Sequence, residues 1–408
     1  MTVCLVLYLL CVVGTASVLT PITAMIAWIR SHDGFVNERR IEPFVSQQNG
    51  VGIRAKIHLF PVYNRSGHSD DVDGADPLLL RIPYKLYMHP FSELHADGTM
   101  HAIAVLYDAG LEYNSMLAVA LALELRNETS LWRPYLDTLP QSLPRFGSRM
   151  NAKEIDLLRR LGNRHGLADR VEERVKIDLD AFARITRHQP ALGLAAEEYL
   201  FAVALINSRC FGAQPAHFLS MRDKSDRLDA NVAVLVPYLD LFNHREARRI
   251  ANRYYHEWNA TTDQMDMVYF ATAFDAPNGS LAPGEEILNS YHVDDLSITY
   301  FLFYGFVLQT KYNLGQSVDS CRDANQCYTL ESQLIDITRH LQFSESHAEK
   351  LNPVTMHAYA TEVALILHDY VAHDQEANPV MTAFIQETLS LAQKALEMMH
   401  GVEDCRRI

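Results

Sequence analysis

The sequence predicts an α+β fold, with small twisted sheets interrupted by a long helical segment and followed by a helical C-terminal region. Three observations predict this class. Short apolar runs bounded by Gly, Pro, Asp and Ser occur before residue 110 and again after residue 212, which is typical of short strands joined by loops. Between these regions, and again beyond Val307, the apolar residues recur with the period of a helix.

The region before residue 110 is expected to hold one helix and two strands. The apolar residues of Ile22–Ile29, followed by Gly34, predict a short helix that ends at a glycine. Lys56–Phe60 and Leu78–Ile82 are short apolar runs between turn-forming residues, so both are predicted to be strands. The polar stretch 64–76 between them is expected to form an exposed loop.

The next region is predicted to be a helical insertion over residues 111–211. Ser115–Arg126 is almost wholly apolar, which favours a buried helix. Asn151 followed by Glu154 is typical of a capping box at the start of a helix. Ala195–Arg209 has helical periodicity and is predicted to close the insertion.

After the insertion, the sequence predicts a return to strands and then two C-terminal helices. Strands are predicted at Val232–Val236, Met267–Thr272 and Ile287–Tyr291. Amphipathic helices are predicted at Thr355–His373 and Val380–His400. The chain is therefore divided into a hydrophobic leader, a first β region, the insertion, a second β region and a helical domain, with bounds 1–20, 21–110, 111–211, 212–308 and 309–408.

The composition favours a globular protein and argues against nucleic acid as a partner. The chain has 408 residues, of which 48% are hydrophobic, and its formal net charge is −14. Binding to a phosphate backbone depends on clustered Lys and Arg, which an acidic chain does not supply. The charge suits a Lys/Arg-rich polypeptide partner, and equally suits a role in solubility alone.

The N-terminus contains a hydrophobic leader. Val3–Val13 is followed by small residues, as in a secretory signal peptide or a signal anchor, although no Lys or Arg precedes it. The alternative is a packing helix or a mis-assigned start. A membrane partner is expected only if the leader is an uncleaved anchor, and location in the secretory pathway only if it is a true signal. Cys321 and Cys327 are a poor zinc signature, and we expect no metal site.

Two short segments have the residue types of a ligand site. Asn49, Gly50, Val51 and Gly52 place two glycines close together, which allows a backbone to approach a ligand; an ordinary turn is the alternative. Arg209 ends an apolar helix, where a guanidinium can bind a carboxylate in a bidentate manner or simply compensate the helix dipole.

Two later segments are also candidates. Residues 240–244, Asp-Leu-Phe-Asn-His, follow a predicted strand and contain enough donors and acceptors to bind a polar ligand or to cap a turn. Tyr291 ends another predicted strand, where its hydroxyl can orient a nucleophile. The aromatic residues around Gly305 can line an apolar channel, and plain packing is the alternative for these tyrosines.

Taken in order with the motif Trp132-x-x-Tyr135-x-x-x-Leu139-Pro140, these segments resemble the SET-domain subfamily of Rubisco large-subunit lysine methyltransferase and actin-histidine methyltransferase. The resemblance runs from about Ile22 to Val307. It implies a β-rich SET fold with a pseudoknotted site, a helical insertion and a C-terminal substrate-binding domain. It also implies an S-adenosylmethionine-dependent transfer of a methyl group to a protein side-chain nitrogen.

The resemblance implies specific roles for residues of this chain. Tyr291 would be the catalytic tyrosine. The residues that would bind S-adenosylmethionine are Asn49, Gly50, Val51, Arg209, Asp240, Leu241, Phe242, Asn243, His244, Tyr304, Gly305 and Phe306. A protein substrate, a monomeric state and a cytoplasmic or nuclear location follow from the same resemblance.

Three departures from the family leave alternatives open. Asn49 replaces a residue that is often acidic, His292 replaces a common Gly, and Ser297 stands where Asn is usual. Lysine is the favoured acceptor, and histidine is the alternative because it needs little deprotonation at neutral pH. The other alternative is a non-catalytic SET scaffold that binds a protein partner.

Overall fold

The computed structural model describes the chain in ranges: 19–46, 50–59, 78–162, 166–214, 232–244, 253–259, 264–270, 281–289, 291, 299–307, 337, 341, 353–373 and 378–406. Several predicted features lie outside these ranges: the leader, the loop 64–76, Asn49, His292, Ser297, Cys321 and Cys327. The described part divides into two compact units, each built from two stretches of chain. The first is Met1–Ser142 with Asp180–Val293, and the second is Leu143–Leu179 with Asp294–Ile408. The predicted domain bounds stay a prediction.

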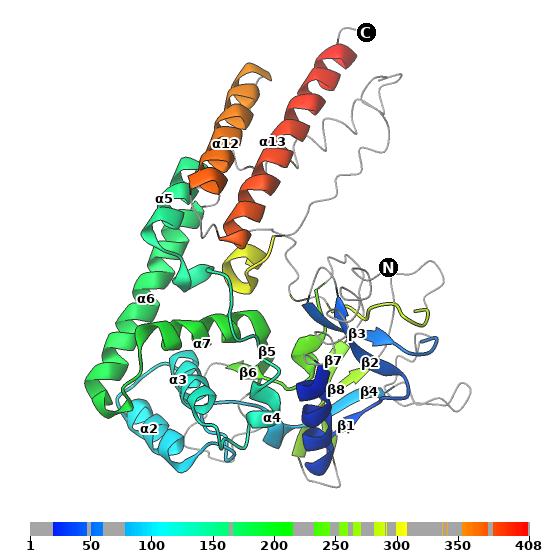
Figure 1. Ribbon diagram of the computed structural model, residues 1–408, viewed down its shortest axis with the longest axis vertical. Helices are drawn as coiled ribbons and strands as arrows, with labels where there is room; N and C mark the ends of the chain where they lie inside the picture. Colours follow the sequence, from blue (N-terminus) through cyan, green and yellow to red (C-terminus); the bar gives the residue numbers. More distant parts are fainter. Residues whose placement is uncertain are drawn as a thin grey trace, which may run out of the picture. The chain divides into compact units, whose positions relative to one another are not determined.

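In the described ranges, the first unit contains three small antiparallel sheets (Figure 1). The largest has the strand order β1-β4-β8-β7, and the other two are the hairpin β2-β3 and the pair β5-β6. The strands are β1 Phe35–Val36, β2 Ile41–Ser46, β3 Gly50–Ala55, β4 Leu78–Pro83, β5 Cys210–Ala213, β6 Val232–Leu235, β7 Arg253–Asn259 and β8 Gln264–Phe270. Small sheets with helices between and after them confirm the predicted α+β class.

Helices pack on one another within the first unit. Residues 19–31 are helical, as predicted, and are followed by α2 Asp97–Asp108, α3 Tyr113–Arg126, α4 Arg133–Leu136 and α7 Ala196–Arg209. Helix α3 packs against both α2 and α7, and most of its side chains are buried because its sequence is apolar on all faces. No helix in the described ranges is long and apolar enough to cross a bilayer.

Two strand predictions are wrong. Residues 56–59 form no strand. The hairpin β2-β3 ends at Ala55, just before them, and Leu59 forms only an isolated bridge with Leu281. The apolar run is buried at Leu59 without extended pairing, which periodicity alone does not distinguish from a strand. Likewise, the described part of 287–291 has no strand: the Ile287 N–H donates to the Ile53 carbonyl of β3, and Asn289 forms an isolated parallel bridge with His244.

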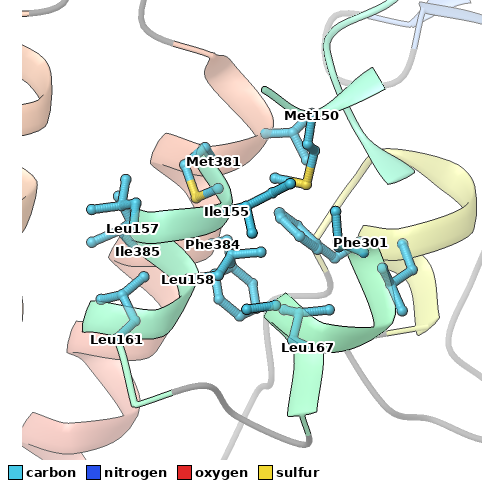
Figure 2. Close-up of a cluster of buried hydrophobic side chains, with 14 of the residues drawn as sticks. Met150, Ile155, Leu157, Leu158, Leu161, Leu167, Phe301, Met381, Phe384 and Ile385 are labelled. Atoms are coloured by element: carbon cyan, nitrogen blue, oxygen red, sulfur yellow. The ribbon is translucent and has the colours of Figure 1, made fainter. Parts of the chain in front are cut away.

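The second unit is helical. Its elements are α5 Ala152–Arg160, the first part of α6 Leu167–His188, a π-helix Tyr300–Tyr304, α12 Pro353–His373 and α13 Pro379–Arg406. Helices α12 and α13 lie side by side (Figure 1). Figure 2 shows the core of this unit, where Phe384 of α13 lies among side chains of α5, α6 and the π-helix. The first part of α13, which was predicted to be an amphipathic helix, therefore contributes to this core.

The predicted capping box at the start of α5 is confirmed. Asn151 Oδ1 accepts a hydrogen bond from the Glu154 N–H at 3.0 Å, and Glu154 Oε2 accepts one from the Asn151 N–H at 2.8 Å. Replacing Asn151 with Ala removes the first of these bonds. We expect the free energy of unfolding to fall by about 1 kcal/mol, measured by urea denaturation, whereas Asn151→Asp should retain most of it. An unchanged midpoint in the Ala variant would show that the cap contributes nothing.

Candidate functional site

Asn243 joins three segments of the first unit that are far apart in the sequence. Its Nδ2 donates to the Val51 carbonyl of β3 at 3.2 Å and to Glu286 Oε1 at 2.7 Å. Its own carbonyl accepts the Asn289 N–H at 2.8 Å. Because the amide nitrogen is used for these two contacts, Asn243 holds the glycine segment against the segment that leads to Tyr291.

The two glycines of β3 have different roles. A Cβ on Gly52 would lie 2.4 Å from Glu286 Oε1 and 2.8 Å from Asn243 Nδ2, so the close approach of the three segments depends on a glycine here. Gly50 has a φ of +72°, and a Cβ there would meet no described atom within 4 Å. The backbone at Gly50 therefore borders open space beside the site.

Tyr291 is fixed at both its hydroxyl and its backbone. The hydroxyl donates a hydrogen bond to the Phe242 carbonyl at 2.8 Å, and the Tyr291 N–H donates to His244 Nδ1 at 3.2 Å. The His244 and Tyr291 rings lie 5.1 Å apart between centroids. Since Phe242 and His244 flank Asn243, the predicted catalytic tyrosine is positioned by the same loop that holds β3.

Burial lowers the pKa of His244 to about 4, so its ring is neutral at pH 7 and its Nδ1 can accept the Tyr291 N–H. An unfolded histidine takes up its proton near pH 6.5, well above this folded value. We therefore expect the free energy of unfolding to decrease as the pH falls from about 6.5 to about 4.

This pH dependence is measured by urea denaturation at a series of pH values. In His244→Asn, the Oδ1 takes the place of Nδ1 as an acceptor but does not titrate, so the decrease over this interval should be smaller than in the wild type. Identical pH profiles for the two proteins would contradict the assignment of a buried neutral imidazole.

Arg209 and Asp240 form an ion pair to which Tyr135 also contributes. Arg209 Nη1 donates to Asp240 Oδ2 at 3.0 Å and to the Asp240 carbonyl at 3.4 Å. The Tyr135 hydroxyl donates to the same Oδ2 at 3.1 Å, and the Asp240 side chain is fully buried. Burial raises the pKa of Asp240, and the charge of Arg209 and the hydroxyl of Tyr135 act in the opposite direction.

The polar atoms around this ion pair fit the amino-acid end of S-adenosylmethionine. Asp240 Oδ1 is buried and accepts no hydrogen bond from the described residues, so it suits a donor such as an ammonium group. Within the described part, the hydrogen bonds of Arg209 all come from Nη1, and its Nε and Nη2 groups suit a carboxylate.

The structure brings most of the predicted site residues together in the first unit. The loop 240–244 contacts Val51 of β3, Arg209 and Tyr291 through the hydrogen bonds described above. The side chains of Leu241 and Phe242 are buried in this unit, so a ligand could reach only their backbone. Tyr304, Gly305 and Phe306 belong to the second unit, where the two aromatic rings lie 6.1 Å apart. Their role at the site, like that of Asn49 outside the described ranges, stays a prediction.

Two residues of the site were not predicted. Glu286 accepts the hydrogen bond of Asn243, and Tyr135 donates one to Asp240. Both belong to motifs that the sequence makes conspicuous, the Gly284-Glu-Glu segment and the Trp-x-x-Tyr motif. The available signal was the presence of Glu286 and Tyr135 in these motifs, and the sequence alone does not show which residues their polar groups contact.

Comparison with known proteins places this site in a familiar fold. No family model matches the chain. It is 26% identical over 283 residues to the chloroplastic [fructose-bisphosphate aldolase]-lysine N-methyltransferase of Arabidopsis thaliana, a match that covers 69% of this chain. The chain spans half the length of this relative.

Solved structures of Rubisco LSMT share the fold. The SET domain of LSMT bound to lysine and AdoHcy matches with a TM-score of 0.54 at 12% identity, covering 95% of this chain and 91% of that one. Rubisco LSMT bound to AdoMet matches with a TM-score of 0.51 at 13% identity, covering 95% and 92%. The predicted SET fold is therefore confirmed, as is the predicted resemblance to Rubisco LSMT.

Proposed function

We propose, from the SET fold of this chain, that it is an S-adenosylmethionine-dependent protein methyltransferase acting on a side-chain nitrogen, with lysine as the acceptor. The observation that carries the proposal is the position of Tyr291. Its hydroxyl is fixed on the Phe242 carbonyl, in the loop that also holds β3 and the Arg209–Asp240 ion pair. A tyrosine fixed beside a set of cofactor-binding groups suits the orientation of a nucleophile.

The relatives support lysine rather than histidine. The Arabidopsis relative is named a lysine N-methyltransferase. One of the similar LSMT structures is bound to lysine and AdoHcy, and another is bound to sinefungin and monomethyllysine. Protein substrates follow for this chain as part of the same proposal.

The residues present suit the cofactor. Arg209 would bind its carboxylate through Nε and Nη2, and Asp240 Oδ1 would accept a hydrogen bond from its ammonium group. The β3 backbone at Gly50 and Val51, and the loop ending at His244, would contact the remainder. When bound, S-adenosylmethionine supplies an electrophilic methyl group on its sulfonium.

The acceptor must be neutral and aligned before it can react. A lysine ammonium has a pKa near 10.4, so deprotonation at pH 7 costs about 4 to 5 kcal/mol, and a site that disfavours the cation lowers this cost. The Tyr291 hydroxyl donates its proton to Phe242, so its oxygen can accept an N–H from the amine. Tyr291 thereby orients the nitrogen for attack, and alignment supplies much of the rate enhancement.

Two measurements test this proposal. Calorimetry with S-adenosylmethionine should show binding, and no binding by the folded protein would favour the non-catalytic scaffold. Incubation with cofactor labelled in the methyl group and a cell lysate should then transfer the label to a protein. Mass spectrometry of that protein should place the label on lysine, and label on histidine would replace lysine with the alternative acceptor.

A further inference from the structure

The motif Trp132-x-x-Tyr135-x-x-x-Leu139-Pro140 contributes one polar group to the site. Trp132, Tyr135, Leu136 and Leu139 are all buried in the first unit. The hydroxyl of Tyr135 nevertheless reaches Asp240, 105 residues further along the chain, at 3.1 Å. Because this buried hydroxyl bonds the ion pair of the binding site, packing alone does not explain why the residue is a tyrosine.

Tyr135 is held on a firmly anchored helix. The Trp132 ring at the start of α4 packs edge to face against Trp28, at 5.6 Å between centroids. The backbone N–H of Trp132 donates to Ser130 Oγ at 3.1 Å, and the Ser130 hydroxyl in turn donates to the buried carboxylate of Glu124. The Tyr135 hydroxyl is therefore presented to Asp240 at a fixed position.

The geometry of the ion pair is unusual for Arg and Asp. Such pairs often form two parallel hydrogen bonds, one to each carboxylate oxygen. Here Asp240 Oδ2 accepts from both Tyr135 and Arg209 Nη1, while Oδ1 accepts from no described residue. The hydrogen bond from Tyr135 to Oδ2 fixes the orientation of the carboxylate, and in this orientation Arg209 reaches it through one nitrogen while Oδ1 stays outside the pair.

We infer that Tyr135 is a positioning residue that keeps Arg209 from closing into a bidentate pair with Asp240, and so keeps the other donors of Arg209 available for the carboxylate of the cofactor and Oδ1 of Asp240 available for its ammonium group. This inference rests on the proposed function, because the ligand is S-adenosylmethionine or its product. Without the hydroxyl, Arg209 and Asp240 bind each other through both oxygens, so the carboxylate of the ligand loses Arg209 and its ammonium group loses Oδ1 of Asp240. The effect is confined to the amino-acid end of the ligand.

The test is calorimetry on Tyr135→Phe with two probes that differ in the amino-acid end. S-adenosylhomocysteine has this end, and its truncated analogue, 5′-methylthioadenosine, lacks both the carboxylate and the ammonium group. We expect the Kd for S-adenosylhomocysteine to rise about tenfold, the cost of losing a hydrogen bond to a charged group, and the Kd for the analogue to stay within about twofold. A purely structural role for Tyr135 would shift both values together and would overturn the inference.

Controls separate the possible outcomes. Tyr113→Phe removes another buried hydroxyl of the first unit and should leave both Kd values unchanged. In an Arg209→Gln background, Tyr135→Phe should change the Kd for S-adenosylhomocysteine by less than about twofold, because coupled residues are not additive. Thermal unfolding checks that each variant is folded, and Tyr135→Met replaces the Phe variant if that one is not.

The inference and the proposed function fail differently. If the wild type binds neither probe, the proposed function is wrong and the role of Tyr135 falls with it. If the wild type binds S-adenosylhomocysteine and Tyr135→Phe binds it equally well, only the role of Tyr135 is wrong.

Discussion

Replacing Tyr291 with Phe is expected to abolish methyl transfer and to leave cofactor binding nearly unchanged. The substitution removes the hydroxyl that is fixed on the Phe242 carbonyl at 2.8 Å, but it keeps the ring beside His244 and the backbone bond to its Nδ1. Loss of a group that orients the acceptor nitrogen should lower the rate at least about 100-fold. The rate is measured as label transferred to the substrate, and binding by calorimetry with S-adenosylhomocysteine.

Tyr113→Phe is the matched control for this prediction. It removes a buried hydroxyl from α3, where the ring packs against Phe91, and should retain wild-type activity. Full activity in the Tyr291 variant would remove Tyr291 from the catalytic role. Loss of S-adenosylhomocysteine binding in that variant would instead assign Tyr291 to the cofactor site.

Replacing Phe384 with Ala is expected to have the largest effect on stability. Phe384 is 1% exposed, and its ring lies 4.5 Å from that of Phe301 in the core of the second unit (Figure 2). Truncation leaves a cavity that the surrounding helices cannot fill, and similar substitutions cost about 3 to 5 kcal/mol. Urea denaturation, followed by circular dichroism, measures the change.

Leu365→Ala on α12 serves as the control for Phe384. Its side chain is 63% exposed, so its removal should change the free energy of unfolding by no more than about 0.5 kcal/mol. Equal effects of the two substitutions would contradict the assignment of Phe384 to a packed core.

Features determined by neighbouring residues could be predicted from the sequence. The capping box of Asn151 and Glu154 depends on a spacing of three residues, and the structure has both hydrogen bonds. The apolar character of α3 and the periodicity of α7 predicted buried helices for the same reason. Local patterns failed for the apolar run at 56–60, because burial of a short run does not by itself imply extended pairing.

Features determined by distant residues could be anticipated only by resemblance. The contact of Tyr135 with Asp240 and that of Asn243 with Val51 join residues far apart in the chain. Neither has a local signature, because side-chain partners across a fold depend on the complete topology. The order of the motifs indicated which segments form the site, but not that Arg209 is paired with Asp240 before any ligand binds.

The parallel bridge between His244 and Asn289 also bears on how the chain could be re-engineered. The stretch of chain between these two residues contains β7 and β8, and the bridge holds its two ends together directly beside the residues that position Tyr291. The geometry of the bridge does not depend on the length of this stretch. A peptide tag inserted in the sequence between β7 and β8 should therefore leave Tyr291 in place, whereas one extra residue between Asp240 and His244 would shift every group that depends on that loop.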